Sequence, residues 1–230
     1  MQLAIDTSTD VAGLALSCDG KVKAELVWCC ERGHTVELWP NLTRLMDMTS
    51  TDIRSIDTIV VAKGPGSFNG LRVGLSAAKG IAFCLNASLI GIGTLEVEAY
   101  PFASSGFPIC PIHNAGRGEI ATALYRMGIS GWHCMVEEGI STMDVLCAQT
   151  NEKTIFCGEP SPAMEEELVR CLGDIAIIPS VISRLRRPGH LAELGWHRLQ
   201  MGQLDDPGIL QPLYLRQPPI TKPKHKTIKK

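Results

Sequence analysis

The sequence lacks the patterns that define several classes of protein. No apolar run reaches the roughly 18 residues that a membrane-spanning helix needs, and the first residues, MQLAIDTSTD, contain no basic segment followed by an apolar one. The nine cysteines are odd in number and no two are spaced C-x-x-C, which disfavours a disulfide framework or a zinc site. We therefore expect a cytoplasmic protein with reduced thiols and no membrane contact.

Signatures of catalysis are missing as well. The six histidines show neither H-x-x-x-H nor H-E-x-x-H spacing, which argues against a histidine metal site. No G-x-S-x-G motif or other local nucleophile signature is present. These absences predict a chain with no catalytic residue and no metal ligand set of its own.

Positive charge is scarce outside the C-terminal tail. The chain has 22 Lys and Arg against 24 Asp and Glu, and the last nine residues, KPKHKTIKK, hold five of the lysines, so the remaining body has 17 basic and 24 acidic residues, a net charge of −7. Direct contact with a phosphate backbone could rest only on this tail, residues 222–230, and on the segment RLRR at 184–187. The composition of the tail favours a solvated, disordered end.

The expected elements occur in an order that repeats once. Three apolar strands begin the chain, and Asp19-Gly20 between the second and third predicts a type I′ hairpin turn. A helix at 35–48, the strand DTIVVAKG, a helix at 67–85, the strand SLIGIG and a helix that bends or ends at Pro101 follow. The same order can be followed from PICPIHN to a last helix at 189–200. Two β-β-β-α-β-α-β-α units predict an α/β protein with a duplicated lobe.

The boundary between the two units falls at 104–108, which gives an N-terminal lobe at 1–105, a C-terminal lobe at 106–221 and the tail at 222–230. The last helix could pack back on the first lobe. Ligands of open α/β sheets bind at the carboxyl ends of the strands. The cleft for a nucleotide or an anion would then be formed by Asp6, Thr7, Gly64, Gly66, Ser67, Asn114, Arg117 and Gly158.

Asp6 has two interpretations that its position leaves open. A carboxylate at the end of a strand could hold a hydrated Mg²⁺ beside a phosphate, or it could hydrogen-bond the turn together with Thr7 or Thr9. The second lobe has Asn114 in the equivalent place. An amide is a weaker magnesium ligand and cannot act as a general base, so the pair that would make a metal site is incomplete.

The stretch GPGSFNGLRVGLSAAKG, residues 64–80, matches neither the dinucleotide fingerprint nor the Walker loop. Its turn could present backbone amides to an anion, with Ser67 or Asn69 as the N-cap. Glycine in a helix costs roughly 0.5–1 kcal/mol relative to alanine, so a glycine-rich face needs close contact with another element. That face, with the adjacent apolar position, consists of Gly70, Leu71, Gly74, Ala77, Ala78 and Ile81.

The element in contact could belong to the same lobe or to a partner chain. The preceding helix favours a partner, because its apolar band is broader than one sheet face requires. This band is formed by Leu38, Trp39, Leu42, Leu45 and Met46.

Five motifs of the chain resemble the bacterial TsaB family, also called YeaZ. They are AIDTST, HTVELWP beginning at His34, GPGSFNGLRVG, HNAGRGE and QPLYLR, and together they extend from residue 1 to about residue 223. The chain departs from the family pattern at Thr35-Val36, where Ser-Glu is usual, at Asn69, where threonine is usual, and in HNAGRGE, where the family has D-A-R-R-G-E. The last change removes a carboxylate and an arginine from the cleft between the lobes.

The resemblance implies an actin-like ATPase (ASKHA) fold of two ribonuclease-H-like lobes and a role as the dimerization subunit of the tRNA threonylcarbamoyladenosine machinery. The implied partners are the catalytic subunit TsaD, bound through the first two helices including His34, the ATPase subunit TsaE, and a second copy when the chain is alone. No cofactor would be bound by this chain alone, whereas ATP or ADP and Mg²⁺ could be held in the complex. tRNA would be reached through the complex, and the lysine tail could touch it.

Two enzymatic alternatives remain open at this point. One is a small-molecule kinase or ATPase of the same fold that uses Asp6 and the Gly158 region. The other is a peptidase, for which no nucleophile and base are visible in the sequence.

Overall fold

The computed structural model describes residues 1–31, 33–129 and 131–216. The first lobe is built on a five-stranded mixed sheet of order β3-β2-β1-β4-β5. Its strands are β1 (Gln2–Asp6), β2 (Val11–Cys18), β3 (Lys21–Cys29), β4 (Thr58–Gly64) and β5 (Ser88–Gly93). The first three strands form an antiparallel meander, and β4 and β5 add in parallel beside β1. Asp19 and Gly20 both have positive φ, as the predicted type I′ turn requires.

The second lobe repeats this arrangement with the order β10-β9-β6-β7-β8. Its strands are β6 (Ile109–Gly116), β7 (Glu119–Gly128), β8 (Gly131–Ser141), β9 (Thr154–Gly158) and β10 (Ala176–Ile177). The antiparallel meander is again followed by two parallel strands. The duplicated α/β architecture predicted from the sequence is therefore confirmed.

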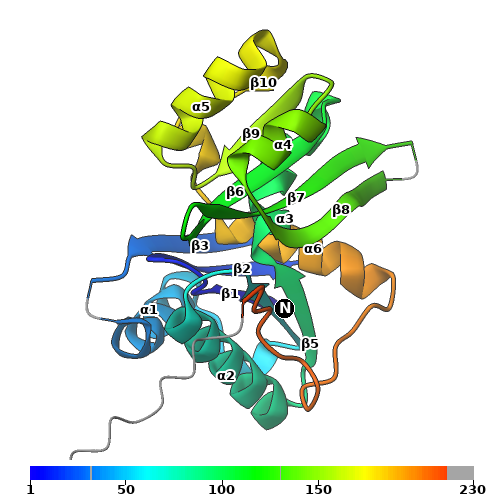
Figure 1. The fold of residues 1–230 in the computed structure, drawn as a ribbon. Coiled ribbons are helices and arrows are strands. Elements are labelled where there is room, and N and C mark those ends of the chain that lie inside the picture. Colours follow the sequence, from blue (N-terminus) through cyan, green and yellow to red (C-terminus); the bar gives the residue numbers. More distant parts are fainter. Residues whose placement is uncertain (32, 130, 217–230) are drawn as a thin grey trace, which may run out of the picture.

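Helices cover both faces of each sheet (Figure 1). The outer face of the first sheet carries α1 (His34–Thr49) and α2 (Phe68–Leu85), and that of the second carries α4 (Met143–Gln149) and α5 (Pro162–Leu172). Two further helices, α3 (Thr94–Ala99) and α6 (Pro188–Gln200), lie between the sheets. Short 3-10 helices occur at Ile53–Ser55, Tyr100–Ser105, Gly173–Ile175 and Ile182–Arg184.

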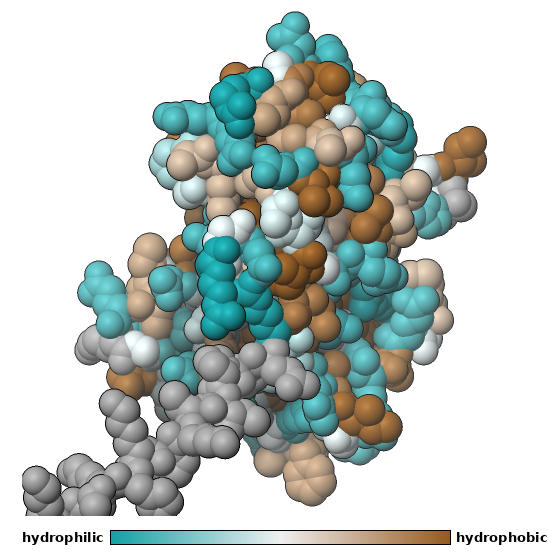
Figure 2. Space-filling view, viewed as in Figure 1, coloured by the Kyte–Doolittle hydropathy of each residue, from teal (hydrophilic) through white to brown (hydrophobic). Residues whose placement is uncertain are grey.

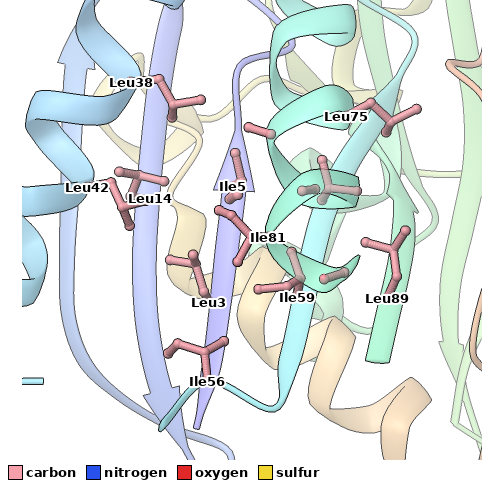
Figure 3. Close-up of a cluster of buried hydrophobic side chains, with 14 of the residues drawn as sticks. Leu3, Ile5, Leu14, Leu38, Leu42, Ile56, Ile59, Leu75, Ile81 and Leu89 are labelled. Atoms are coloured by element: carbon pink, nitrogen blue, oxygen red, sulfur yellow. The ribbon is translucent and has the colours of Figure 1, made fainter. Parts of the chain in front are cut away.

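The core of the first lobe follows from the alternation of side chains along each strand. Leu3 and Ile5 point from β1 toward α1 and α2, whereas Ala4 points to the opposite face. Figure 3 shows Leu38 and Leu42 of α1 directed at the strands. The larger core therefore lies under α1 and α2, and a thinner layer of small side chains faces α6.

The helices α3 and α6 are exchanged between the lobes. Helix α6 follows the second sheet in sequence but packs on the first, where Leu191 and Leu194 cover Ala4 and Val60. Helix α3 follows the first sheet, and its Leu95 packs with the core of the second. The last helix thus returns to the N-terminal lobe.

Two predicted elements are shorter than their sequence patterns suggest. Helix α3 ends at Ala99, and a 3-10 helix containing Pro101 continues it, because proline cannot donate the next helical hydrogen bond. In the apolar run IAIIP, where the repeated order requires the last strand of the second unit, only Ala176 and Ile177 pair, before Pro179. In the described part of the chain, no helix combines the length and the hydrophobicity needed to cross a bilayer.

Candidate functional site

A buried arginine fills the junction between the lobes. Arg186 lies two residues before α6 and donates from Nε to Asp6 Oδ2 at 2.6 Å and from Nη1 to Glu98 Oε1 at 2.8 Å. Its Nη2 donates to Thr9 Oγ1 at 2.6 Å and to the Val11 carbonyl at 2.9 Å. A further contact joins Nη1 to Glu159 Oε1 at 3.4 Å. All five N–H groups of the guanidinium therefore have acceptors.

The second lobe adds a histidine to this cluster. The Nε2 atom of His113 lies 2.7 and 2.8 Å from the two carboxylate oxygens of Glu98, and Thr9 donates to Glu159 across the junction at 3.1 Å. We call Arg186, Asp6, Thr9, Glu98, His113 and Glu159 the Arg186 network. It joins residues of β1, α3, β6 and the turn after β9, so the same contacts hold both lobes.

Burial and charge act in opposite directions on the two central groups. Burial alone would raise the pKa of Glu98, but the charge and hydrogen bond of His113, followed by those of Arg186, hold that pKa below its usual value. Burial would likewise lower the pKa of His113, but the charge and hydrogen bond of Glu98 outweigh it and raise that pKa. Both pKa shifts favour the charged pair of a Glu98 carboxylate and a His113 imidazolium beside the Arg186 guanidinium.

The residues present at Asp6 do not fit a magnesium ion. Oδ1 accepts from both the amide and the hydroxyl of Ser8, and Oδ2 is bound by Arg186. Glu98, His113 and Glu159 do place three donor atoms within 4.8 Å of one another. Both of those carboxylates also bind Arg186, which puts a positive charge where a cation would enter.

The turn before α2 packs against the turn after β1. The Ser67 amide donates to the Ser8 carbonyl at 2.6 Å, and a side chain at Gly66 would meet that carbonyl at 2.1 Å. Ser67 caps the helix by accepting from the Gly70 amide, as the sequence suggested. Gly64 has φ +113 and lies against the backbone of Leu213. Part of the expected anion cradle is thus satisfied within the lobe.

The structure corrects where the glycine face of α2 points. A Cβ at Gly70 would lie 2.1 Å from the Thr7 carbonyl, and one at Gly74 would lie 2.3 Å from Thr7 Oγ1. Thr7 in turn donates to the Gly70 carbonyl at 2.7 Å. The glycine face of α2 therefore packs against its own lobe, which is the first of the two alternatives, and not against a partner chain. The same holds for the rest of the face, which is buried at Leu71, Ala77, Ala78 and Ile81.

The apolar band of α1 is divided between the core and the surface. Trp39 is 50% exposed, whereas the other members contribute to the core of the first lobe, namely Leu38, Leu42, Leu45 and Met46. His34 is half-buried beside Gly70. A docking role for these helices stays a prediction, and it now depends on the apolar residues they expose, which are Val36, Trp39, Met48 and Phe83.

The remaining cleft residues lie around a separate cavity of about 600 Å³. It opens between the β6–β7 hairpin, the turn before α2 and the described C-terminal segment 213–216. We call it the hairpin pocket, and its principal lining residues are Gly66, Phe68, His113, Asn114, Arg117, Tyr214 and Arg216. Asn114 accepts from the Gly116 amide, and Arg117 is exposed at the hairpin tip. Gly158 lies instead beside Glu98 and Ile112.

The segment RLRR does not present a basic patch. Arg184 is bound to Glu165, Arg186 belongs to the network, and the exposed Arg187 pairs with Glu25. The other basic segment, residues 222–230, lies outside the described residues. The network itself was missed by motif analysis, although Glu98 gave a signal: it stands three residues after Leu95 on the buried face of its helix, and a buried acid needs a partner.

Comparisons with known proteins place the chain among tRNA-modification proteins. Residues 29–166, more than half of the chain, match the model of the TsaD family, described as tRNA N6-adenosine threonylcarbamoyltransferase. A Bacillus subtilis relative, named tRNA threonylcarbamoyladenosine biosynthesis protein TsaB, is 29% identical over 221 residues, which is 93% of either chain. The protein of the same name from Escherichia coli is 31% identical over 147 residues, 63% of either chain.

A solved structure shares the fold. The structure described as YeaZ from Pseudomonas aeruginosa superposes with a TM-score of 0.78 and 20% sequence identity, and the match covers 93% of this chain and 99% of that one. The two lobes with their repeated sheets thus form the arrangement seen in that protein.

Proposed function

The chain belongs to the TsaB (YeaZ) family, and on this premise we propose that it is a subunit of the machinery that makes threonylcarbamoyladenosine in tRNA. In this role it binds and supports TsaD during transfer of threonylcarbamoyl to the adenosine beside the anticodon, without catalysing the step itself. TsaE is a further partner. ATP or ADP and Mg²⁺ are held in the assembled complex and not by this chain alone.

The Arg186 network is the observation that carries the non-catalytic assignment. An actin-like ATPase would bind a metal-nucleotide between its lobes, where this chain has a side chain with all its donors in use. Removing that arginine from its partners would leave Asp6 and Glu98 as buried, uncompensated charges. The chain therefore keeps the junction closed with its own cation.

The exposed apolar residues of α1 and α2 support an assembly role. Trp39 is 50% exposed and Phe83 is 86% exposed, and the two helices lie side by side on the outside of the first lobe (Figure 1). Exposed aromatic residues are the usual anchors of protein interfaces. This surface would bind TsaD, or a second copy when the chain is alone.

Binding of purified TsaD to Trp39→Ala and Phe83→Ala tests the assignment of this surface. We expect each variant to weaken the complex by roughly tenfold or more, because truncated anchor residues commonly cost that much. Ile182→Ala is the matched control, since Ile182 is also 86% exposed but lies on the second lobe. Dissociation constants from calorimetry that stay unchanged for both aromatic variants would exclude this face.

An activity assay tests the non-catalytic role separately. Together, TsaD, TsaE and this chain should modify tRNA when threonylcarbamoyl-adenylate is supplied. A separate enzyme forms this compound from ATP, threonine and bicarbonate. The isolated chain should not turn over ATP. Turnover by the isolated chain would instead favour the kinase or ATPase alternative.

A further inference from the structure

The hairpin pocket carries positive charge in an otherwise acidic protein. Arg117 forms no ion pair with a described residue, and Arg216 pairs with Glu119 while donating to the Ala115 carbonyl at 3.0 Å. Arg72 lies beside the pocket wall, 3.8 Å above the ring of Phe68. Two guanidinium groups thus line the pocket and a third stacks on its Phe68, with one carboxylate paired to Arg216, although the chain without its last nine residues has a net charge of −7. Such a local excess attracts anions.

The histidine of the Arg186 network also reaches this pocket. His113 is almost completely buried and turns Nε2 toward Glu98, while its ring lines the pocket. Its Nδ1 forms no hydrogen bond with the described residues. The ring therefore has one nitrogen in the network and one that no described residue binds.

The other wall of the pocket is flat and apolar. The rings of Phe68 and Tyr214 have centroids 5.1 Å apart and planes inclined by 33°. Leu213 and Ile140 extend this surface. In Figure 2, hydrophilic and hydrophobic residues lie next to each other near the middle of the drawn face. The pocket thus combines cationic groups with a surface on which a planar ring can lie.

The hairpin tip allows a cation to reach a ligand. Gly116, Arg117 and Gly118 all have positive φ, and a side chain at either glycine would meet nothing within 4 Å. The tip therefore projects from the protein with Arg117 at its end. Across the pocket, Gly66 leads into the first turn of α2, whose Ser67 and Gly70 amides are already bound within the protein, so the cations of the pocket lie on the hairpin and C-terminal side.

We propose that the hairpin pocket binds a nucleoside monophosphate, distinct from the ATP or ADP that the complex holds, with the phosphate between Arg117 and Arg216 and the base against Phe68 and Tyr214. Guanidinium groups bind phosphate oxygens through paired hydrogen bonds, and Arg117 and Arg216 can offer them from two sides of the pocket, with Glu119 already paired to Arg216. The nucleotide can be free or part of an RNA chain. The RNA source rests on the proposed function, whereas the free nucleotide does not.

The test compares two charge-removing variants with a matched control. Arg117→Asn removes the charge with a residue that tolerates the left-handed backbone, and Arg216→Gln removes the second charge. Arg54→Gln is the control, because Arg54 is exposed like Arg117 and paired with one acid, Asp52, as Arg216 is with Glu119, but lies in the first lobe. Melting temperatures confirm that each variant is folded.

Titration calorimetry with AMP, with adenosine as the phosphate-free comparison, measures the free ligand. We expect AMP to bind at low salt, adenosine to bind at least tenfold more weakly, and each pocket variant to weaken AMP by roughly tenfold. Arg54→Gln should match the parent chain. This result identifies a free nucleotide as a ligand.

A gel-shift titration with tRNA at two salt concentrations tests whether the nucleotide is part of an RNA chain. If AMP does not bind but Arg117→Asn and Arg216→Gln lower tRNA affinity and reduce the salt slope by about 1 each, the pocket binds an RNA phosphate. If neither AMP nor tRNA separates these variants from Arg54→Gln, the proposal is wrong. Unchanged TsaD binding by the same variants keeps this result independent of the proposed function.

Discussion

The two lobes have the same topology but fill the space between helix and sheet differently. Gly74 and Leu168 each stand six residues after the start of the helix that follows the fourth strand of its sheet, and both are buried. In the first lobe the backbone of α2 comes close to Thr7, so no side chain fits. In the second lobe Leu168 packs against Phe156 and Cys110. The same topology therefore allows two kinds of packing. Either the helix backbone lies close to the neighbouring strand end, or a large side chain fills the space between helix and sheet.

The ends of the corresponding first strands differ in the same way. Strand β1 ends in the buried Asp6, whereas β6 has the buried His113 followed by the exposed Asn114. No symmetric pair of carboxylates results. A cation from a third segment, Arg186, joins the two unlike ends. The two lobes therefore share their topology but not the functional side chains at the ends of their first strands.

The largest effect should come from the residue that both lobes share. Arg186→Met removes the cation and leaves Asp6 and Glu98 buried without it, so the free energy of unfolding should fall by about 3–5 kcal/mol. Arg187→Met is the control: this neighbour is 60% exposed beside Glu25, and its loss should change stability by less than about 1 kcal/mol. Urea denaturation measures both. Equal effects would mean that the network does not join the lobes.

Placing a leucine in α2, at the position where the second lobe has Leu168, should also destabilise the protein. Gly74→Leu places a side chain where Thr7 Oγ1 would lie 2.3 Å from its Cβ. Overpacking of this kind typically costs about 1–3 kcal/mol. Thermal unfolding of the isolated chain should show the loss even without a partner. A variant with the parent melting temperature would contradict the packing described for this face.

The contribution of His113 to the free energy of unfolding should depend on pH. Because the folded-state pKa of His113 is raised, its interaction with Glu98 is fully present below the unfolded-state pKa, about 6.5, and is lost as pH rises through the folded-state value. The lowered pKa of Glu98 has the opposite consequence at acidic pH. His113→Gln should therefore flatten the decline in unfolding free energy above pH 6.5. Parallel curves for the variant and the parent would exclude this contribution.

The smallest effect is a gain, and it separates the two faces of α2. Gly80 is exposed in the same helix, and a side chain there would meet nothing within 4 Å. Gly80→Ala should raise the unfolding free energy by about 0.5–1 kcal/mol through helix propensity alone. A shift to a higher denaturant midpoint with an unchanged slope is the expected measurement. A loss would indicate a contact on the outer face.

Local patterns were sufficient to predict the fold, because each pattern has a local cause. Alternating apolar residues define the strands, and Asp19-Gly20 defines the first turn. The glycines of α2 showed that another element must come close. They could not show which one, because glycine spacing is the same whether the neighbour is Thr7 or another chain.

The Arg186 network could not be predicted from local patterns. Arg186 is 180 residues from Asp6 and 88 residues from Glu98 in sequence. A run of basic residues is usually solvated, so RLRR gave no sign that its third member is buried. Only the tertiary arrangement decides which arginine turns inward.

The exchange of α3 and α6 has a consequence for the synthesis of the chain. All strands of the first sheet have left the ribosome once residue 93 has emerged, but the residues of α6 that cover its inner face, Leu191 and Leu194, are made only after the whole second sheet. Until then Ala4 and Val60 lack the contact with α6, and only Val97 of α3 can reach this cluster. The N-terminal half therefore cannot complete its native packing before α6 has emerged, and both halves should mature together as a single cooperative folding unit.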